Sequence, residues 1–202
     1  EQGTIWLGTY FGGVNYFNPE YEIYTRYKTG DTEKEGLSSP IVGRMTEDKS
    51  GNLWICTEGG GVNVYDRKNN TYRWYRHEEG KNSISHNNVK AIYYDRNHEI
   101  MWIGTHLGGL NKLDLRTNRF TAYRMKAGDP ASLPSDIVRD IVPYKDKLVI
   151  ATQNGICLFD PITGTCQQLF KETKEGRGIG MVASLCIDKD STLWIAATGE
   201  GV

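Results

Sequence analysis

The chain has 202 residues and carries 24 Lys and Arg residues against 25 Asp and Glu residues, so its net charge is close to zero. A balanced charge gives no electrostatic basis for binding nucleic acid or an anionic membrane surface. No apolar run approaches the ~20 residues of a membrane-spanning helix, and the 23 Gly residues and 11% aromatic residues favour tight turns that join many short strands.

One short pattern recurs five times along the chain. It consists of an apolar strand of the type Leu-Trp-Ile-Gly-Thr, a glycine-rich turn, and a second strand that ends in Asp or Asn. Its central apolar position falls on Trp6, Trp54, Trp102, Val149 and Trp194, at steps of 48, 48, 47 and 45 residues. A near-constant period in this range, filled by short strands, is typical of propeller blades.

Each period divides into four predicted strands, which we call A to D. In the second period we expect them at residues 41–47, 53–57, 62–66 and 71–76. The A–B turn starts with Asp48, a residue that suits the first position of a type I turn. One position of the C–D turn is expected to be left-handed, because Asn70, Asn118 or Gly164 occupies it in successive repeats.

A longer polar loop follows strand D and leads to the next strand A. Three copies of this loop share a short motif in which Leu37, Ile84 or Leu133 lies between small residues. We expect this apolar side chain to be buried and to hold the loop against its blade.

The strand pattern favours radial stacking of similar sheets. Strands such as 53–55 are apolar on both faces, so each sheet needs a neighbour on both sides, which a propeller supplies. The recurring Trp would then lie between adjacent blades. The predicted fold class is all-β, with four-stranded antiparallel meanders as β-propeller blades, about four in number. The expected bounds are a partial blade at 3–28, blades at 41–76, 88–124 and 137–170, and a partial blade at 181–202.

The four Cys residues form no C-x-x-C pair, which argues against a zinc or thioredoxin-type site. Each occupies a slot of the repeat, so we expect Cys56, Cys157, Cys166 and Cys186 to be small core residues. If positions 160 and 165 pair across the C–D turn, Cys157 and Cys166 lie diagonal to each other in one hairpin, and we expect both to remain free thiols.

The L-W-I-G-T, G-G-V/L-N and D-x-x-T/N-N/G motifs closely resemble the two-component regulator propeller repeat over essentially the whole chain. The resemblance implies a periplasmic ligand-sensing segment of a hybrid two-component sensor histidine kinase from a polysaccharide-degrading Gram-negative bacterium. It further implies oligosaccharides as the signal. We expect no cofactor. The chain, which begins inside a predicted strand, would then be an arc of a seven-bladed ring. Its partners would be the other blades and downstream domains of the same receptor, and open blade edges would allow a homodimer.

Residues that vary inside this constant frame are the candidate ligand contacts. The B–C turns and D–A loops of a blade emerge on one face around the central axis, and the B–C turns differ between repeats although their flanks are nearly invariant. Basic groups at the start of strand A and an aromatic ring suit an acidic or sulfated sugar. The predicted ligand-binding residues are Tyr10, Phe11, Glu58, Lys90, His106, Arg139, Gln153 and Arg177.

No catalytic or metal-binding constellation stands out in the sequence. The four His residues fall in loops and turns without the spacing of metal ligands. Glu58 and His106 are the only acid–base candidates near the expected ligand face. Ligand sensing is therefore the favoured function, and a propeller carbohydrate lyase or glycosidase and a protein-docking scaffold stay open as alternatives.

Overall fold

The computed structural model describes residues 5–9, 11–18, 23–170 and 179–198. In these ranges every regular element is a β-strand, and strands that follow one another in each sheet are antiparallel neighbours. The strands belong to two compact units, with the boundary after Val89. Within the same ranges, no helical segment has the length and apolarity that crossing a bilayer requires.

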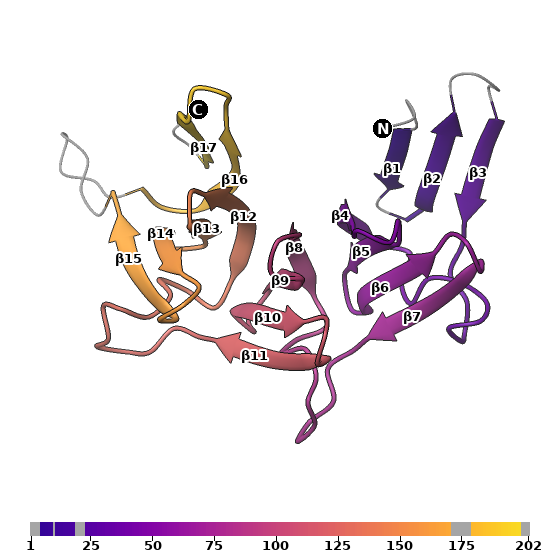
Figure 1. Cartoon of the computed structure of the whole chain (residues 1–202), viewed down its shortest axis with the longest axis horizontal. Coiled ribbons are helices and arrows are strands. Elements are labelled where there is room, and N and C mark those ends of the chain that lie inside the picture. Colours follow the sequence, from indigo (N-terminus) through magenta and orange to yellow (C-terminus); the bar gives the residue numbers. More distant parts are fainter. Residues whose placement is uncertain (1–4, 10, 19–22, 171–178, 199–202) are drawn as a thin grey trace. The chain divides into compact units, whose positions relative to one another are not determined.

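The first unit contains two sheets (Figure 1). One has three strands, β1 (Ile5–Thr9), β2 (Gly13–Asn18) and β3 (Ile23–Tyr27). The other is a four-stranded meander of β4 (Val42–Glu47), β5 (Leu53–Thr57), β6 (Gly61–Asp66) and β7 (Thr71–Tyr75). The four strands predicted for the second period are therefore confirmed.

The second unit contains two four-stranded meanders and a two-stranded sheet (Figure 1). The first meander has β8 (Val89–Asp95), β9 (Ile100–Thr105), β10 (Leu110–Asp114) and β11 (Arg119–Tyr123). The second has β12 (Val138–Tyr144), β13 (Lys147–Thr152), β14 (Gly155–Asp160) and β15 (Thr165–Leu169). The last sheet pairs β16 (Val182–Ile187) with β17 (Leu193–Ala197). Repeated antiparallel meanders confirm the predicted all-β class.

The C–D turns have the backbone conformation that their sequence predicts. Asn70 and Asn118 both have a φ of 53°, and Gly164 has a φ of 73°. This left-handed conformation favours Gly and Asn over other residues, which explains why only these two types occupy the position in the three turns.

The recurring Trp lies between neighbouring sheets in each unit. In the first unit Trp6 packs against the core cluster that contains Ile55 and Tyr65 of the adjacent meander, and Arg67 Cζ of that meander lies 4.7 Å from the centroid of its ring. In the second unit Trp102 is fully buried and its ring lies 5.4 Å from Phe159, which belongs to β14 of the next meander. The predicted position of Trp between blades is therefore confirmed at these two contacts.

A hydrogen bond from the Trp indole to the preceding A–B turn is a feature that the turn chemistry alone does not predict. Trp54 Nε1 donates to Asp48 Oδ2, and Trp194 Nε1 donates to Asp188 Oδ2, both at 2.9 Å. In each case the Asp lies six residues before the Trp. These Asp residues therefore stabilise strand B as well as the turn, which explains why they recur.

The corresponding turn of the next meander has one more residue and loses this bond. Asp95 lies seven residues before Trp102, and its Oδ2 atom is 2.7 Å from Nδ1 of His98 instead. Among the described residues Trp102 Nε1 has no hydrogen-bond partner, although it is buried. A single inserted residue thus moves the carboxylate out of reach of the indole.

The D–A loops are held as predicted by their central apolar residue, since Leu37 and Ile84 are fully buried and Leu133 is 2% exposed. In the first unit an amide adds a second attachment. Asn63 Oδ1 accepts a hydrogen bond from the Ser38 backbone N–H at 2.8 Å, and Asn63 Nδ2 donates to Ser38 Oγ at 2.7 Å. The residue type at position 63 is therefore matched to the residue at position 38 of its D–A loop.

The fourth repeat changes both residues of this contact. Pro134 takes the place of Ser38 in the loop, and Cys157 takes the place of Asn63 on the strand. Because Pro has no backbone N–H group, an Asn at 157 would lose the donor that it accepts from in the other repeat. The substitution to Cys removes that mismatch and places a thiol in the core.

Three of the four Cys residues are buried as predicted, namely Cys56, Cys157 and Cys166. Cys186 is exposed, so its assignment to the core was wrong. The neighbouring Leu185 is 6% exposed and faces the core. Since successive residues of a strand point to opposite faces, Cys186 faces away from that core.

Candidate ligand-binding rim

In each unit, backbone hydrogen bonds bring the B–C turns to the same edge as the D–A loops and the starts of strand A. We call this edge the rim. In the second unit the Gly109 N–H donates to Asp136 O at 2.8 Å, and the Gln153 N–H donates to Ile137 O at 3.0 Å. In the first unit the Glu58 N–H donates to Ile41 O at 3.0 Å. The segments that were predicted to share a ligand face therefore meet within each unit.

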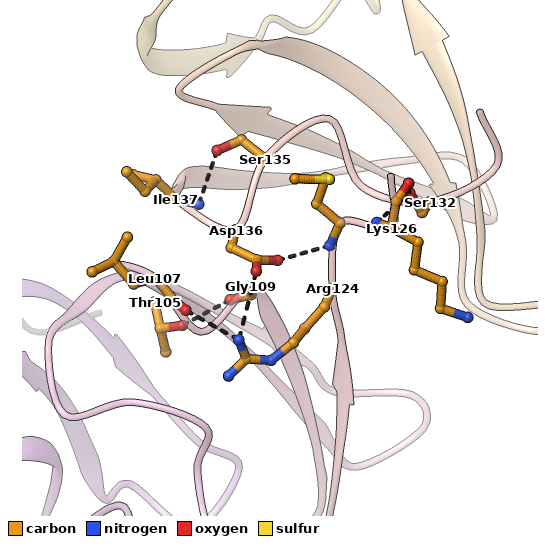
Figure 2. Close-up of polar contacts among 10 residues, drawn as sticks. Thr105, Leu107, Gly109, Arg124, Lys126, Ser132, Ser135, Asp136 and Ile137 are labelled. Atoms are coloured by element: carbon orange, nitrogen blue, oxygen red, sulfur yellow. Dashed lines mark hydrogen bonds and ion pairs between the residues drawn. The ribbon is translucent and has the colours of Figure 1, made fainter. Parts of the chain in front are cut away.

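An Arg that the sequence analysis missed organises the rim of the second unit (Figure 2). Arg124 Nη1 donates to Leu107 O at 3.2 Å and lies 3.5 Å from Asp136 Oδ2. The other carboxylate oxygen of Asp136 accepts a hydrogen bond from the Met125 N–H at 2.7 Å. Arg124 thus ties the B–C turn of one meander to the loop that leads to the next.

The repeat contains a sequence pattern that could have identified Arg124. A basic residue follows the last Tyr of strand D three times, at steps of 48 residues, as Lys28, Arg76 and Arg124. Arg76 also reaches a D–A loop, because its Nη2 atom donates to Ser38 O at 3.4 Å. The recurrent slot therefore supplies positive charge to the rim in both units.

Leu107 is an exposed apolar residue of this rim. Its side chain is 54% exposed and its φ is 77°. The matching position in the second repeat is Gly59, with a φ of 78°. A left-handed backbone costs a residue with a Cβ atom roughly 1–2 kcal/mol, and such strain gathers at functional sites. The turn thus keeps an unfavourable Leu where Gly would fit, which points to a use for the exposed side chain.

Two of the predicted ligand-binding residues contact each other. Gln153 Oε1 accepts hydrogen bonds from Arg139 Nε at 3.1 Å and Nη2 at 2.6 Å. Arg139 lies at the start of β12 and Gln153 in the β13–β14 turn, and both are half-buried. A neutral amide orients the guanidinium without cancelling its charge, so the group is prepared to bind an anion.

Phe11 lines a hollow on the rim of the first unit. Its side chain is 71% exposed, and it borders a cavity of 190 Å³ together with the basic residues Arg26 and Lys28. Arg26 Nε donates to Gly12 O at 3.1 Å, which fixes the guanidinium beside the turn. An aromatic face next to two cations fits the predicted ligand chemistry, although Arg26 and Lys28 were not among the predicted residues.

The remaining predicted residues lie on separate elements. Lys90 is the second residue of β8, and His106 lies in the β9–β10 turn. Tyr10 and Arg177 lie outside the described residues. Glu58 belongs to the first unit and His106 to the second, so neither unit contains both acid–base candidates. In the described part of the chain, no group of three or more His, Cys, Asp or Glu residues is arranged to hold a metal ion.

Comparison with known proteins connects this architecture to a repeat family. Residues 36–59 and 83–106 match the family model of the two-component regulator propeller. No curated protein matches the chain.

Solved structures share the fold over nearly the whole chain. The extracellular domain named for the hybrid two-component system BT3049 from B. thetaiotaomicron is 24% identical, with a TM-score of 0.78 over 99% of this chain and 25% of that one. The corresponding domain of BT4673 from the same organism is 24% identical, with a TM-score of 0.76 over 98% of this chain and 27% of that one. Virginiamycin B lyase from Staphylococcus aureus is 13% identical, with a TM-score of 0.70 over 96% of this chain and 60% of that one.

This chain spans about a quarter of the length of the two extracellular domains. The two matched segments each run from a D–A loop through strands A and B to the B–C turn, so they begin and end at the rim. Residues 36–59 and 83–106 therefore match the two-component regulator propeller repeat, and the chain is folded as β-propeller blades.

Proposed function

We propose that this chain is an extracytoplasmic ligand-sensing segment of a hybrid two-component sensor kinase, located in the periplasm. The observation that carries the proposal is the rim, where variable side chains project from a nearly constant frame of repeats. The repeat family and the extracellular domains that share the fold support the same reading. In this proposal a histidine kinase carried by other domains of the receptor receives the signal across the membrane.

The ligand that the rim fits best is an anionic oligosaccharide. The guanidinium of Arg139 is held by Gln153, and charge-assisted hydrogen bonds from Arg suit carboxylate and sulfate groups. In the first unit the exposed ring of Phe11 lies beside Arg26 and Lys28. An aromatic face offers an apolar surface to the ring of a sugar while the cations bind its acidic substituents.

Signalling would start from the contacts that the ligand makes at the rim. Arg124 already links the B–C turn to the following D–A loop through Leu107 O and Asp136. A ligand that binds this turn and the start of β12 would stabilise one arrangement of turn and loop. Differential binding to one arrangement is what allows a ligand to shift an equilibrium between receptor states.

The test is isothermal titration of the chain with sulfated or uronic-acid oligosaccharides and with their desulfated or carboxyl-reduced counterparts. We expect the anionic members to bind, the neutral counterparts to bind at least tenfold more weakly, and the recovered oligosaccharides to be intact. Absence of binding by every member would reject oligosaccharide sensing by this chain.

A propeller lyase or glycosidase is the second candidate, because virginiamycin B lyase shares the fold. Product analysis of the same titration mixtures separates the two functions. Cleaved product would support the enzyme and overturn the sensor, whereas binding without turnover supports the sensor. Glu58 and His106 would be the first residues to replace if turnover were seen.

A further inference from the structure

The β14–β15 hairpin places two thiols in contact inside the core of the second unit. The Sγ atoms of Cys157 and Cys166 lie 2.8 Å apart. Cys157 is fully buried and Cys166 is 8% exposed. Phe159 pairs with Cys166 and Gln168 pairs with Cys157, so the two cysteines are diagonal neighbours on one face, in the register that the sequence predicts.

Diagonal placement therefore does not keep these sulfur atoms apart. A disulfide bond has an S–S length of ~2.05 Å, so the two sulfurs need to approach each other by less than about 1 Å. The third buried thiol, Cys56, lies in the first unit, and Cys186 is exposed on β16. Of the cysteines in the described chain, only Cys157 and Cys166 are in contact with each other.

Cys166 also has a route to solvent. It lines a cavity of 260 Å³ whose wall includes Tyr123, Arg124 and Lys126. Cys157 is not part of that wall. A hydrogen bond with Cys166, reinforced by burial, raises the pKa of the Cys157 thiol, which disfavours its thiolate. Cys166 is consequently the sulfur that a small reagent in the cavity reaches first.

We propose that Cys157 and Cys166 form a reversible intrachain disulfide, a redox modification site within a single propeller blade, with a small organic disulfide as the oxidant. In the structure both are free thiols, as expected, and the proposal concerns what an added oxidant does to them. The Cys166 thiolate attacks one sulfur of the oxidant, which gives a mixed disulfide and releases one thiol. Cys157 Sγ then attacks Cys166 Sγ and releases the second thiol. The two cysteines lose two electrons and two protons, and the oxidant gains both to become two thiols.

The test uses the folded chain with Cys186→Ala, which removes the exposed thiol and leaves Cys56, Cys157 and Cys166. The protein is incubated in native buffer with the small neutral reagent bis(2-hydroxyethyl) disulfide. It is then unfolded in denaturant containing iodoacetamide, and its intact mass is measured. We expect a single alkylated thiol, on Cys56, and a peptide spanning residues 157–166 that is two hydrogen masses lighter than its reduced form.

Cys166→Ala in the same background is the matched control, and its Cys56 and Cys157 should both be alkylated without any loss of two hydrogens. Reduction of the oxidised parent with dithiothreitol should restore three alkylated thiols. Three alkylated thiols in the parent before reduction would overturn the proposal. A stable hydroxyethyl adduct on Cys166 would also overturn it, because the second sulfur would then have failed to close the bond.

Discussion

At the scale of single residues, the spacing between an Asp and a Trp decides whether a buried indole finds a partner. With a spacing of six residues Trp54 donates its hydrogen bond to Asp48, whereas with a spacing of seven Trp102 Nε1 has no hydrogen-bond partner in the described part of the chain. Asp48 also accepts hydrogen bonds from the backbone N–H groups of Ser50 and Asn52, at 2.8 and 3.0 Å. The same carboxylate therefore stabilises both the turn and the strand.

Replacing Asp48 with Ala should reduce the free energy of unfolding of the first unit by about 2–3 kcal/mol, because hydrogen bonds to a charged acceptor are lost and a buried donor is left unsatisfied. Asp95→Ala is the control, and it should cost under about 1 kcal/mol, since the bonds of Asp95 lie in an exposed turn. Urea denaturation followed by Trp fluorescence measures both variants. Equal losses would contradict the role given to the indole hydrogen bond.

The Asp residues at the C–D turns predict how stability depends on pH. The backbone N–H of Thr117 is the main reason that the pKa of Asp114 lies below its usual value, and the N–H of Thr163 does the same for Asp160. A carboxyl whose pKa is lower in the folded state stabilises the fold above its unfolded pKa of ~3.9 and loses that contribution as the pH falls through its folded value.

Denaturation midpoints should therefore be nearly constant from about pH 7 to pH 5 and should fall below about pH 4. Asp114→Asn should be less stable than the wild type at neutral pH, and the difference should shrink on acidification. If the midpoint of the wild type rose below pH 4, the sign assigned to these groups would be wrong.

At the scale of the elements, the blade contacts depend on aromatic side chains between sheets. Trp102 of β9 meets Phe159 of β14 and is fully buried. Trp102→Ala should destabilise the second unit by roughly 3–5 kcal/mol, as large-to-small core changes do. Trp102→Phe keeps much of the apolar volume and deletes an indole N–H without a described partner, so it should cost clearly less. Thermal unfolding of both variants checks this, and equal costs would argue against Trp102 as a packing contact.

The same repeat explains which elements the sequence predicts well. Strand positions, the left-handed C–D turns and the buried residues of the D–A loops all follow from local pattern and period. The contact between Asn63 and Ser38 and its replacement by Cys157 and Pro134 depend on pairing between a strand and a distant loop. Such pairs become visible only once the blades are assembled.

The solvent exposure of side chains in the sheet of β16 and β17 was harder to predict. The pattern of β16 matches the other A strands, yet Cys186 faces away from the core. A repeat pattern describes the average environment of a slot, and the two-stranded sheet of β16 and β17 departs from that average. The last Trp reflects the same difference, since Trp194 is 51% exposed whereas Trp54 is 3% exposed.

At the scale of the whole molecule, the meeting of turns and loops at the rim could be predicted from the sequence, whereas ligand binding there stays a prediction. The rim follows from blade topology, because the B–C turns and D–A loops lie at one end of each meander. Individual contacts depend on side-chain geometry, which explains why Arg124 and the exposed Leu107 were missed while Arg139 and Gln153 were found together. The recurrent basic residue after strand D was the sequence signal that could have identified Arg124.

The most direct test of the proposed sensing role is isothermal titration of an anionic oligosaccharide into Arg139→Ala and Arg116→Ala. A charge-assisted contact is worth about 1.5–3 kcal/mol, so Arg139→Ala should weaken binding roughly tenfold to a hundredfold and leave the melting temperature unchanged. Arg116 lies in the β10–β11 turn, at the opposite end of its meander from the rim, so Arg116→Ala should bind like the wild type. Equal losses in the two variants, or full affinity in Arg139→Ala, would contradict the assignment of the rim as the ligand site.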